Sequence, residues 1–212
     1  CVSCGDVLDK KEDHICLKCL YHLPKTYLHD QPDNEIEKRF WGKVEIERAS
    51  AFFYFKKGSS FQQLLHHLKY KGDKEIGEVL GKQIGIDLIS TSDFSSVDVI
   101  VPVPLHKKKL RKRGYNQSEW IAKGIASKME KPIDTGNLYR KVENPTQTRK
   151  GVYERWENVN GIFALKDNEI FRNKHILLVD DVLTTGSTIE ACAKAILQSE
   201  NAKVSVITLA VA

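Results

Sequence analysis

Two adjacent carboxylates and a run of small hydroxyl residues stand close together in the last third of the chain. Asp180 and Asp181 directly follow the apolar run 176–179, and the segment 184–188 reads Thr-Thr-Gly-Ser-Thr. A short continuous apolar run is typical of a strand that is buried on both faces of a parallel sheet. Because ligands of open α/β sheets bind outside the carboxyl ends of the strands, we expect the two aspartates to face a bound molecule.

The hydroxyl-rich segment leads into a predicted helix, because apolar residues recur at helical spacing from Ile189 to Leu197. The N-terminus of a helix binds anions through its free backbone N–H groups and its positive dipole end, and small hydroxyl side chains add donors. We therefore predict a phosphate site formed by Thr184, Thr185, Gly186, Ser187 and Thr188. A phosphate site next to two carboxylates, which accept hydrogen bonds from vicinal hydroxyls, suits a sugar phosphate.

Two other interpretations of this stretch compete with a sugar phosphate site. An apolar strand that ends in acids also occurs as the Walker B strand of P-loop ATPases, but these need a Gly-x-x-x-x-Gly-Lys-Ser/Thr loop, which the sequence lacks. The second interpretation is a core strand that ends in a solvated Asp-Asp turn. It leaves the hydroxyl segment and the helix start as a coincidence.

Cysteines form a second group with possible chemistry. Four of the five lie in two Cys-x2-Cys pairs, eleven residues apart: Cys1, Cys4, Cys16 and Cys19. This polar stretch is too short for its own hydrophobic core, and a tetrahedral zinc ion then supplies the folding energy. We predict a zinc ribbon or knuckle, with His14 and His22 near enough to act as substitute ligands and disulfide pairing as the alternative. Cys192 belongs to a predicted apolar helix stripe.

A third group is cationic and follows the predicted strand 97–104, whose prolines fit the end of a strand. The stretch 106–113 carries six cationic residues: Lys107, Lys108, Lys109, Arg111, Lys112 and Arg113. At a strand exit these cations would lie on the same rim as Asp180, where they can neutralise a pyrophosphate. A solvated basic loop and contact with nucleic-acid phosphates are the alternatives.

Other elements must hold these groups in place. Further strands are predicted at 49–55, 161–165 and 204–212, and further helices start near 61, 76 and 117. In the first helix His66, His67 and Lys69 lie off the apolar stripe, which indicates a solvated face. The segment 138–160 has no clear periodicity, and such a long polar loop in a compact α/β domain is often a lid.

The length and composition of the chain limit how many folded units it can form. At 212 residues the chain can bury one main core plus a small appendage. We expect a zinc-binding segment at 1–23, a connector at 24–47 and one α/β domain at 48–212. The net charge of +5 is weak evidence for an anionic partner. No apolar run has the length of a membrane span, none resembles a secretory signal, and the start at Cys1 leaves open what precedes it.

The stretch 176–188 resembles the phosphoribosyl diphosphate (PRPP) signature of type I phosphoribosyltransferases: four apolar residues, two acids, two apolar residues and Thr-Thr-Gly-Ser-Thr. The resemblance implies that Asp180 and Asp181 hold the ribose 2′ and 3′ hydroxyls, and that 184–188 holds the 5′-phosphate. Enzymes of this family that act on 6-oxopurines usually carry an aspartate at the place of Thr184. Such a base is therefore disfavoured as the acceptor here.

Over essentially its whole length the chain resembles the ComF family of competence-associated, phosphoribosyltransferase-like proteins. The shared features occur in family order: the two N-terminal Cys pairs, the stretch 64–72, the Val-Pro-Val-Pro-Leu-His run with its basic tail, Gly114-Tyr115-Asn116-Gln117, Thr146-Gln147, Arg155, Asn158 and the PRPP motif. The resemblance implies a type I phosphoribosyltransferase fold, with a mainly parallel sheet flanked by helices, and a zinc module. It also implies a cytoplasmic location and a link to DNA uptake.

Two main hypotheses for function follow from these motifs. In the first, Mg²⁺ bridges pyrophosphate and ribose oxygens of PRPP, and an unidentified acceptor nitrogen displaces pyrophosphate at C1. Asp180 and Asp181 fix the ribose, and the cations of 107–113 stabilise the leaving pyrophosphate. The loop that carries Thr146, Gln147 and Arg155 closes to exclude water.

In the second hypothesis the protein is a non-catalytic, PRPP-responsive accessory factor. It binds single-stranded DNA through the zinc module and the basic stretch, and it works with proteins of the competence machinery. A third interpretation is a zinc-stabilised α/β interaction module without a ligand. The sequence leaves the acceptor and the oligomeric state open.

Overall fold

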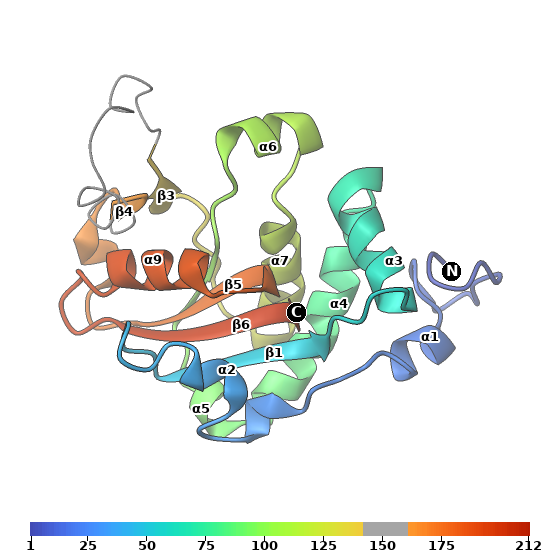
Figure 1. The fold of residues 1–212 in the computed structure, drawn as a ribbon, viewed down its shortest axis with the longest axis horizontal. Helices are drawn as coiled ribbons and strands as arrows, with labels where there is room; N and C mark the ends of the chain where they lie inside the picture. Colours follow the sequence, from blue (N-terminus) through green and yellow to red (C-terminus); the bar gives the residue numbers. More distant parts are fainter. Residues whose placement is uncertain (142–160) are drawn as a thin grey trace.

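The computed structural model describes residues 1–141 and 161–212, and a four-stranded sheet lies at its centre (Figure 1). The strand order is β1-β6-β5-β2, and each neighbouring pair is parallel. The strands are β1 (Arg48–Tyr54), β2 (Val99–Pro102), β5 (His175–Leu183) and β6 (Lys203–Val211). Buried apolar residues dominate all four strands, as expected of a sheet covered on both faces. The structure thus confirms the predicted α/β fold with a parallel sheet.

One face of the sheet is covered by four helical segments: α3 (Ser60–His66), the π-helical turn η2 (His67–Lys71), α4 (Glu75–Ile89) and α7 (Gln117–Met129). Their apolar side chains form one core with Leu177 and Ile207 of the sheet. Helices α4 and α7 lie so close that a Cβ atom on Gly124 would come within 2.2 Å of the Glu78 carbonyl oxygen. This close approach fixes α7 against α4.

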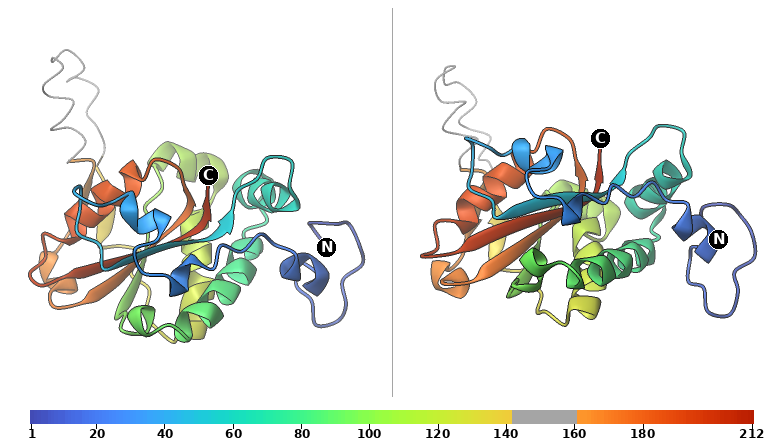
Figure 2. Two further views of the ribbon diagram at one scale, coloured as in Figure 1. Left: turned by 60° about the horizontal axis from the view of Figure 1, so that its bottom comes forward. Right: turned by 90° about the horizontal axis from the view of Figure 1, so that it is seen from below.

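The opposite face carries α9 (Ser187–Ile196) and short N-terminal elements, η1 (Leu28–Asp30) and α2 (Glu35–Lys38). Figure 2 shows α4 and α7 on one side of the sheet and α2 and α9 on the other. The antiparallel pair of β3 (Leu138–Arg140) and β4 (Phe163–Leu165) and the turn η4 (Asn168–Phe171) also belong here. Phe40, Leu178 and Ile196 lie in this second core.

The N-terminal residues and α1 (Leu17–Tyr21) lie beside α3 (Figures 1 and 2). Residues 24–47, the expected connector, follow the sheet: Lys25 forms an antiparallel bridge with Phe53, and Ile36 and Phe40 are buried. The domain boundaries drawn from the sequence remain a proposal. Two short helices, α5 (Ser92–Ser95) and α6 (Lys107–Arg113), flank β2 in the chain. In the described ranges, no helix combines the length and the apolarity needed to cross a membrane.

Candidate functional site

The two aspartates lie at the carboxyl end of the central strands. Strand β5 continues through both of them to Leu183, and Asp180 is in register with Thr208 of β6. Asp180 is half-buried, whereas Asp181 is only 7% exposed. The pair therefore stands where a parallel sheet presents side chains to a ligand.

The first turn of α7 holds both carboxylates. Gln117 donates its side-chain amide to Asp181 Oδ2 at 2.7 Å, and the Ser118 hydroxyl donates to Asp180 Oδ1 at 2.8 Å. Asn116 caps the helix, because its Oδ1 accepts from the Ser118 backbone N–H. Gln117 was expected only as part of a family motif, and Ser118 was not predicted from the sequence.

Lys69 also reaches the acid pair, with its Nζ 3.0 Å from Asp181 Oδ2. The expectation of a solvated face is therefore wrong for Lys69, whose side chain is 23% exposed, although His66 is exposed as expected. The cause is the π-helical turn η2, whose wider winding departs from the 3.6-residue period on which that expectation rested. Such π-helical turns occur frequently at functional sites.

Burial and the charge of the neighbouring carboxylate act in the same direction on the pKa of Asp180, and hydrogen bonds oppose them. Burial, and then the neighbouring charge of Asp181, raises the pKa of Asp180 to about 7 from its ordinary value of 3.8. The hydrogen bonds from the Asp181 backbone N–H and from Ser118, and the nearby Lys69, oppose this shift. The site thus holds a carboxyl group that changes its protonation state near neutral pH.

Asp180→Asn is expected to stabilise the protein above neutral pH. Because the pKa of Asp180 in the folded state is raised, its contribution to stability is complete below pH 3.8 and is lost as the pH rises to about 7. Asparagine keeps an oxygen acceptor for Ser118 but carries no charge. We expect its free energy of unfolding in urea to exceed that of the wild type by roughly 2 to 4 kcal/mol at pH 8, and by much less at pH 5. An equal difference at both pH values would contradict the raised pKa.

The hydroxyl segment forms the turn between β5 and α9. Gly186 is the N-cap of α9 and has a φ of 84°, a left-handed conformation that favours glycine. The ring of Phe40 would lie 3.2 Å from a Cβ atom at this position, which further favours glycine. Thr185 Oγ1 and Ser187 Oγ are 3.1 Å apart, and Arg39 donates to the Thr184 carbonyl at 2.6 Å. The four hydroxyl residues are exposed: Thr184, Thr185, Ser187 and Thr188.

The cationic stretch forms the short helix α6. His106 caps its start by accepting from the Lys108 N–H at 3.1 Å, and Gly114 ends it in a left-handed conformation. Five of the six cations are exposed: Lys107, Lys108, Lys109, Arg111 and Lys112. Arg113 is half-buried and donates to Gln117, which in turn holds Asp181. Of the six, the structure connects Arg113 to the acid pair.

Three further residues proposed for the lid lie outside the described residues: Thr146, Gln147 and Arg155. The segment 142–160 that contains them separates β3 from β4 in the chain. Their assignment as lid residues remains a prediction from the sequence.

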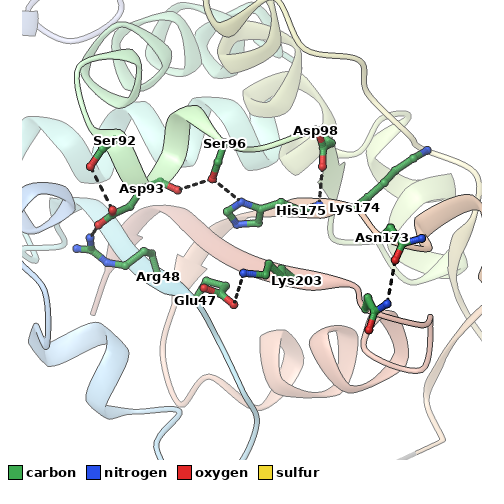
Figure 3. Close-up of a pocket in the computed structure, with 11 residues that line it drawn as sticks. Glu47, Arg48, Ser92, Asp93, Ser96, Asp98, Asn173, Lys174, His175 and Lys203 are labelled. Atoms are coloured by element: carbon green, nitrogen blue, oxygen red, sulfur yellow. Dashed lines mark hydrogen bonds and ion pairs between the residues drawn. The ribbon is translucent and has the colours of Figure 1, made fainter.

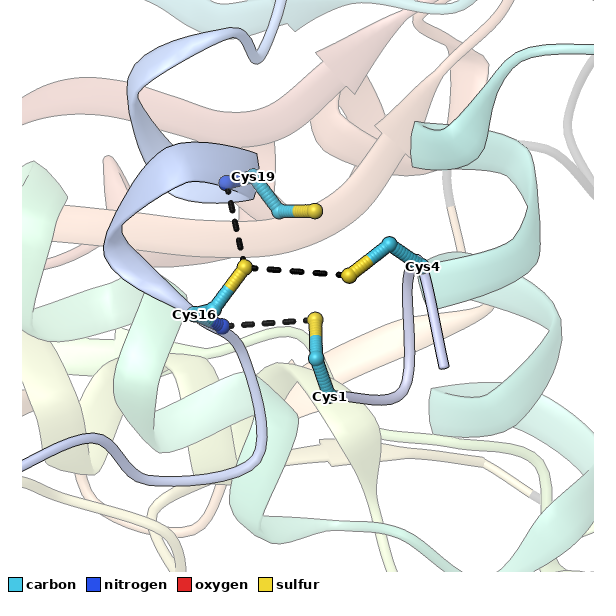
Figure 4. Close-up of side chains that lie close together, drawn as sticks. All are labelled: Cys1, Cys4, Cys16 and Cys19. Carbon is cyan, nitrogen blue, oxygen red and sulfur yellow. Dashed lines mark hydrogen bonds between the residues drawn. The ribbon is translucent and has the colours of Figure 1, made fainter. Parts of the chain in front are cut away.

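The four N-terminal cysteines come together as the spacing predicts (Figure 4). Their Sγ atoms all lie within 4.8 Å of one another, and those of Cys4 and Cys16 are 3.8 Å apart. Sulfurs that bind one zinc ion tetrahedrally at ~2.3 Å lie ~3.8 Å apart, so the cluster fits this metal. The backbone N–H groups of Cys16 and Cys19 donate to the sulfurs of Cys1 and Cys16. All four thiols are free of disulfides.

A cavity of about 590 Å³ opens at the opposite, amino end of the strands (Figure 3). Four of its charged groups form two ion pairs, Arg48 with Asp93 and Lys203 with Glu47. The ring of His175 lies between two serine hydroxyls, and burial lowers its pKa. Ion pairs and hydrogen bonds thus join several residues that line this cavity, and none of the residues predicted to bind a ligand lies there.

The part of the chain that contains the two aspartates is similar to known proteins. The model of the phosphoribosyl transferase domain family matches residues 115–212. Competence protein ComFC of Bacillus subtilis is 27% identical over 216 residues, which cover 99% of this chain and 82% of that protein. DNA utilization protein YhgH of Escherichia coli K12 is 29% identical over 146 residues, which cover 68% of this chain. This match spans only 63% of the length of the E. coli protein.

Among solved structures, the glutamine PRPP amidotransferase of B. subtilis aligns with a TM-score of 0.47 and 18% identity. The alignment covers 64% of this chain and 26% of that one.

Proposed function

Because the chain belongs to the ComFC/YhgH family of competence and DNA-utilization proteins with a phosphoribosyl transferase domain, we propose that it binds PRPP with Mg²⁺ and transfers the phosphoribosyl group to an acceptor nitrogen. In this reaction the bond from C1 to the pyrophosphate oxygen breaks, and its electron pair leaves with pyrophosphate. The acceptor nitrogen forms the new bond to C1 with its lone pair and releases its proton to water. The acceptor itself stays unidentified.

The proposal depends on one observation: in each of the two carboxylates, one oxygen contacts the protein and the other has no partner among the described residues. Asp180 Oδ1 accepts from Ser118 and from the Asp181 backbone, and Asp181 Oδ2 faces Gln117 and Lys69. The other two oxygens, Asp180 Oδ2 and Asp181 Oδ1, accept no hydrogen bond from residues 1–141 or 161–212. Each aspartate is thus fixed through one oxygen and offers the second, which suits a pair of vicinal hydroxyls.

The hydroxyl segment 184–188, which is the proposed phosphate site, follows Leu183 at the end of the same strand. A 5′-phosphate bound to the backbone N–H groups at the start of α9 leaves the ribose above the carboxylates. Bound Mg²⁺ supplies neutralisation of the pyrophosphate charge. The two aspartates orient the ribose and place negative charge near C1, where positive charge develops as pyrophosphate leaves.

Pyrophosphate release tests this function. The purified protein, with zinc bound, is incubated with PRPP and Mg²⁺ and a panel of nucleobases, and separately with single-stranded DNA. We expect release that depends on one acceptor and that is lost in Asp181→Asn. PRPP binding without release under every condition would contradict the transferase activity.

The exposed charge of α6 favours a second candidate function. Five cations of one short helix face solvent, which suits the phosphates of a nucleic acid better than a single bound pyrophosphate. In this alternative the protein is a PRPP-responsive factor that binds single-stranded DNA without catalysis. DNA affinity that falls steeply with salt would support it, and failure to bind oligonucleotides at low salt would exclude it.

A further inference from the structure

Lys69 is the cation of the described chain that forms an ion pair with the acid pair, and the proposed function gives it no role. Its Nζ lies 3.0 Å from Asp181 Oδ2, and its charge also acts on Asp180. By contrast, the cations of α6 touch neither carboxylate directly, and Arg113 is linked to Asp181 only through Gln117. Among the cations of residues 1–141 and 161–212, Lys69 is therefore the one that contacts the acid pair.

The two faces of the sheet give the direction in which a ligand lies. The hydroxyl segment 184–188 leads into α9, which packs on one face of the sheet together with Phe40 and Leu178. Lys69 follows Leu68, which packs in the core of the other face together with the residues of α7. A ribose whose 5′-phosphate lies at the start of α9 and whose diol lies on the aspartates points its C1 substituent away from α9. This direction leads toward the face from which Lys69 comes.

The backbone that carries Lys69 is fixed at several points. Leu68 is fully buried, and its carbonyl accepts a hydrogen bond from the Tyr115 hydroxyl. His67 Nδ1 lies 2.6 Å from Asp73 Oδ2, and Gly72 ends the turn in a left-handed conformation. The long lysine side chain is consequently the movable part of this segment. Its ammonium can leave Asp181 for a phosphate oxygen while its Cα stays in place.

We propose that Lys69 is the residue that binds the pyrophosphate group of PRPP, and that in the unliganded protein its ammonium pairs with Asp181. This inference rests on the proposed function, because it assigns a contact within the same site. In the unliganded state the ion pair compensates the charge of a carboxylate that is 7% exposed. In the bound state the ribose hydroxyl takes a place at Asp181, and the ammonium neutralises the more highly charged pyrophosphate.

Three ligands separate this role from its alternatives: PRPP, ribose 5-phosphate and pyrophosphate, each titrated by calorimetry at pH 8 with Mg²⁺. Lys69→Met is expected to weaken binding of PRPP and of pyrophosphate at least tenfold and to change ribose 5-phosphate affinity less than threefold. Lys71→Met is the matched control, because it removes an exposed lysine two residues further along the same turn. It is expected to bind all three ligands as the wild type does. Lys69→Arg, which keeps the charge, is expected to restore most of the pyrophosphate affinity and guards against a folding defect.

Two results would overturn the inference while leaving the proposed function intact. Equal losses for PRPP and ribose 5-phosphate in Lys69→Met would mean that Lys69 only orients Asp181. Unchanged or tighter PRPP binding in that variant would mean that Lys69 is only a counter-ion of the empty site. A wild-type protein that binds neither PRPP nor ribose 5-phosphate would instead overturn the proposed function and this inference together.

Discussion

Asp180→Asn/Asp181→Asn is expected to weaken the binding of PRPP with Mg²⁺ by at least about 100-fold in calorimetry. Hydrogen bonds to charged groups each contribute about 1.5 to 3 kcal/mol, and the double variant removes the charge from both acceptors proposed to bind the ribose hydroxyls. Asparagine has nearly the same shape and still accepts from Ser118 and Gln117 through its oxygen. The loss is therefore expected in ligand binding and not in folding.

Glu78→Gln/Glu169→Gln is the control for this double variant. It removes two carboxylates that form surface ion pairs with Lys82 and Arg172. At pH 8, above the pKa of Asp180, the net charge changes by nearly the same amount, so an effect of the overall field would appear in both proteins. PRPP affinity in Asp180→Asn/Asp181→Asn equal to that of the wild type would show that the acid pair does not hold the ribose.

Removal of the metal is expected to unfold the N-terminal module and to leave the sheet folded. A structural zinc site contributes an apparent binding free energy of about 10 to 16 kcal/mol, and a stretch with so few apolar residues has little else to hold it. Ile15 is 1% exposed and packs with the core that lies under α3, so unfolding of the module also uncovers this edge. We expect one zinc ion per chain in the purified protein.

A thiol titration measures this unfolding directly. In the zinc-loaded protein all thiols are expected to react slowly with an aromatic disulfide reagent. After a chelator, Cys1, Cys4, Cys16 and Cys19 are expected to react rapidly. Cys192 is an internal control, because it is fully buried in α9 and burial raises its pKa, so it stays protected while the sheet is folded. Protein isolated without metal and with these four thiols already oxidised would contradict the zinc site.

Local sequence patterns predicted the central strand and its neighbours well. The apolar run 176–179, the two acids and the hydroxyl segment each report a local property: burial, charge and turn geometry. The structure places all three in the expected order on β5 and at the start of α9. The cysteine cluster could be predicted equally well, since the Cys-x2-Cys spacing itself brings two sulfurs together.

Contacts between distant parts of the chain could not be predicted from local sequence patterns. Gln117 and Ser118 meet the aspartates across more than sixty residues of sequence, at |i−j| of 64 and 62, and no local pattern encodes this contact. Lys69 was misplaced because a π-helical turn breaks the helical period. The contact of Phe40 with Gly186 likewise joins the N-terminal segment to the phosphate turn through tertiary packing alone.

The most direct test of the central claim is a calorimetric titration of the zinc-loaded, wild-type protein with PRPP in the presence of Mg²⁺. If the acid pair and the hydroxyl segment form the site, one PRPP binds per chain and its binding is saturable. Ribose without phosphate is expected not to compete. Absence of binding at millimolar PRPP, in protein whose zinc content and folding are intact, would contradict the claim that this edge of the sheet is a PRPP site.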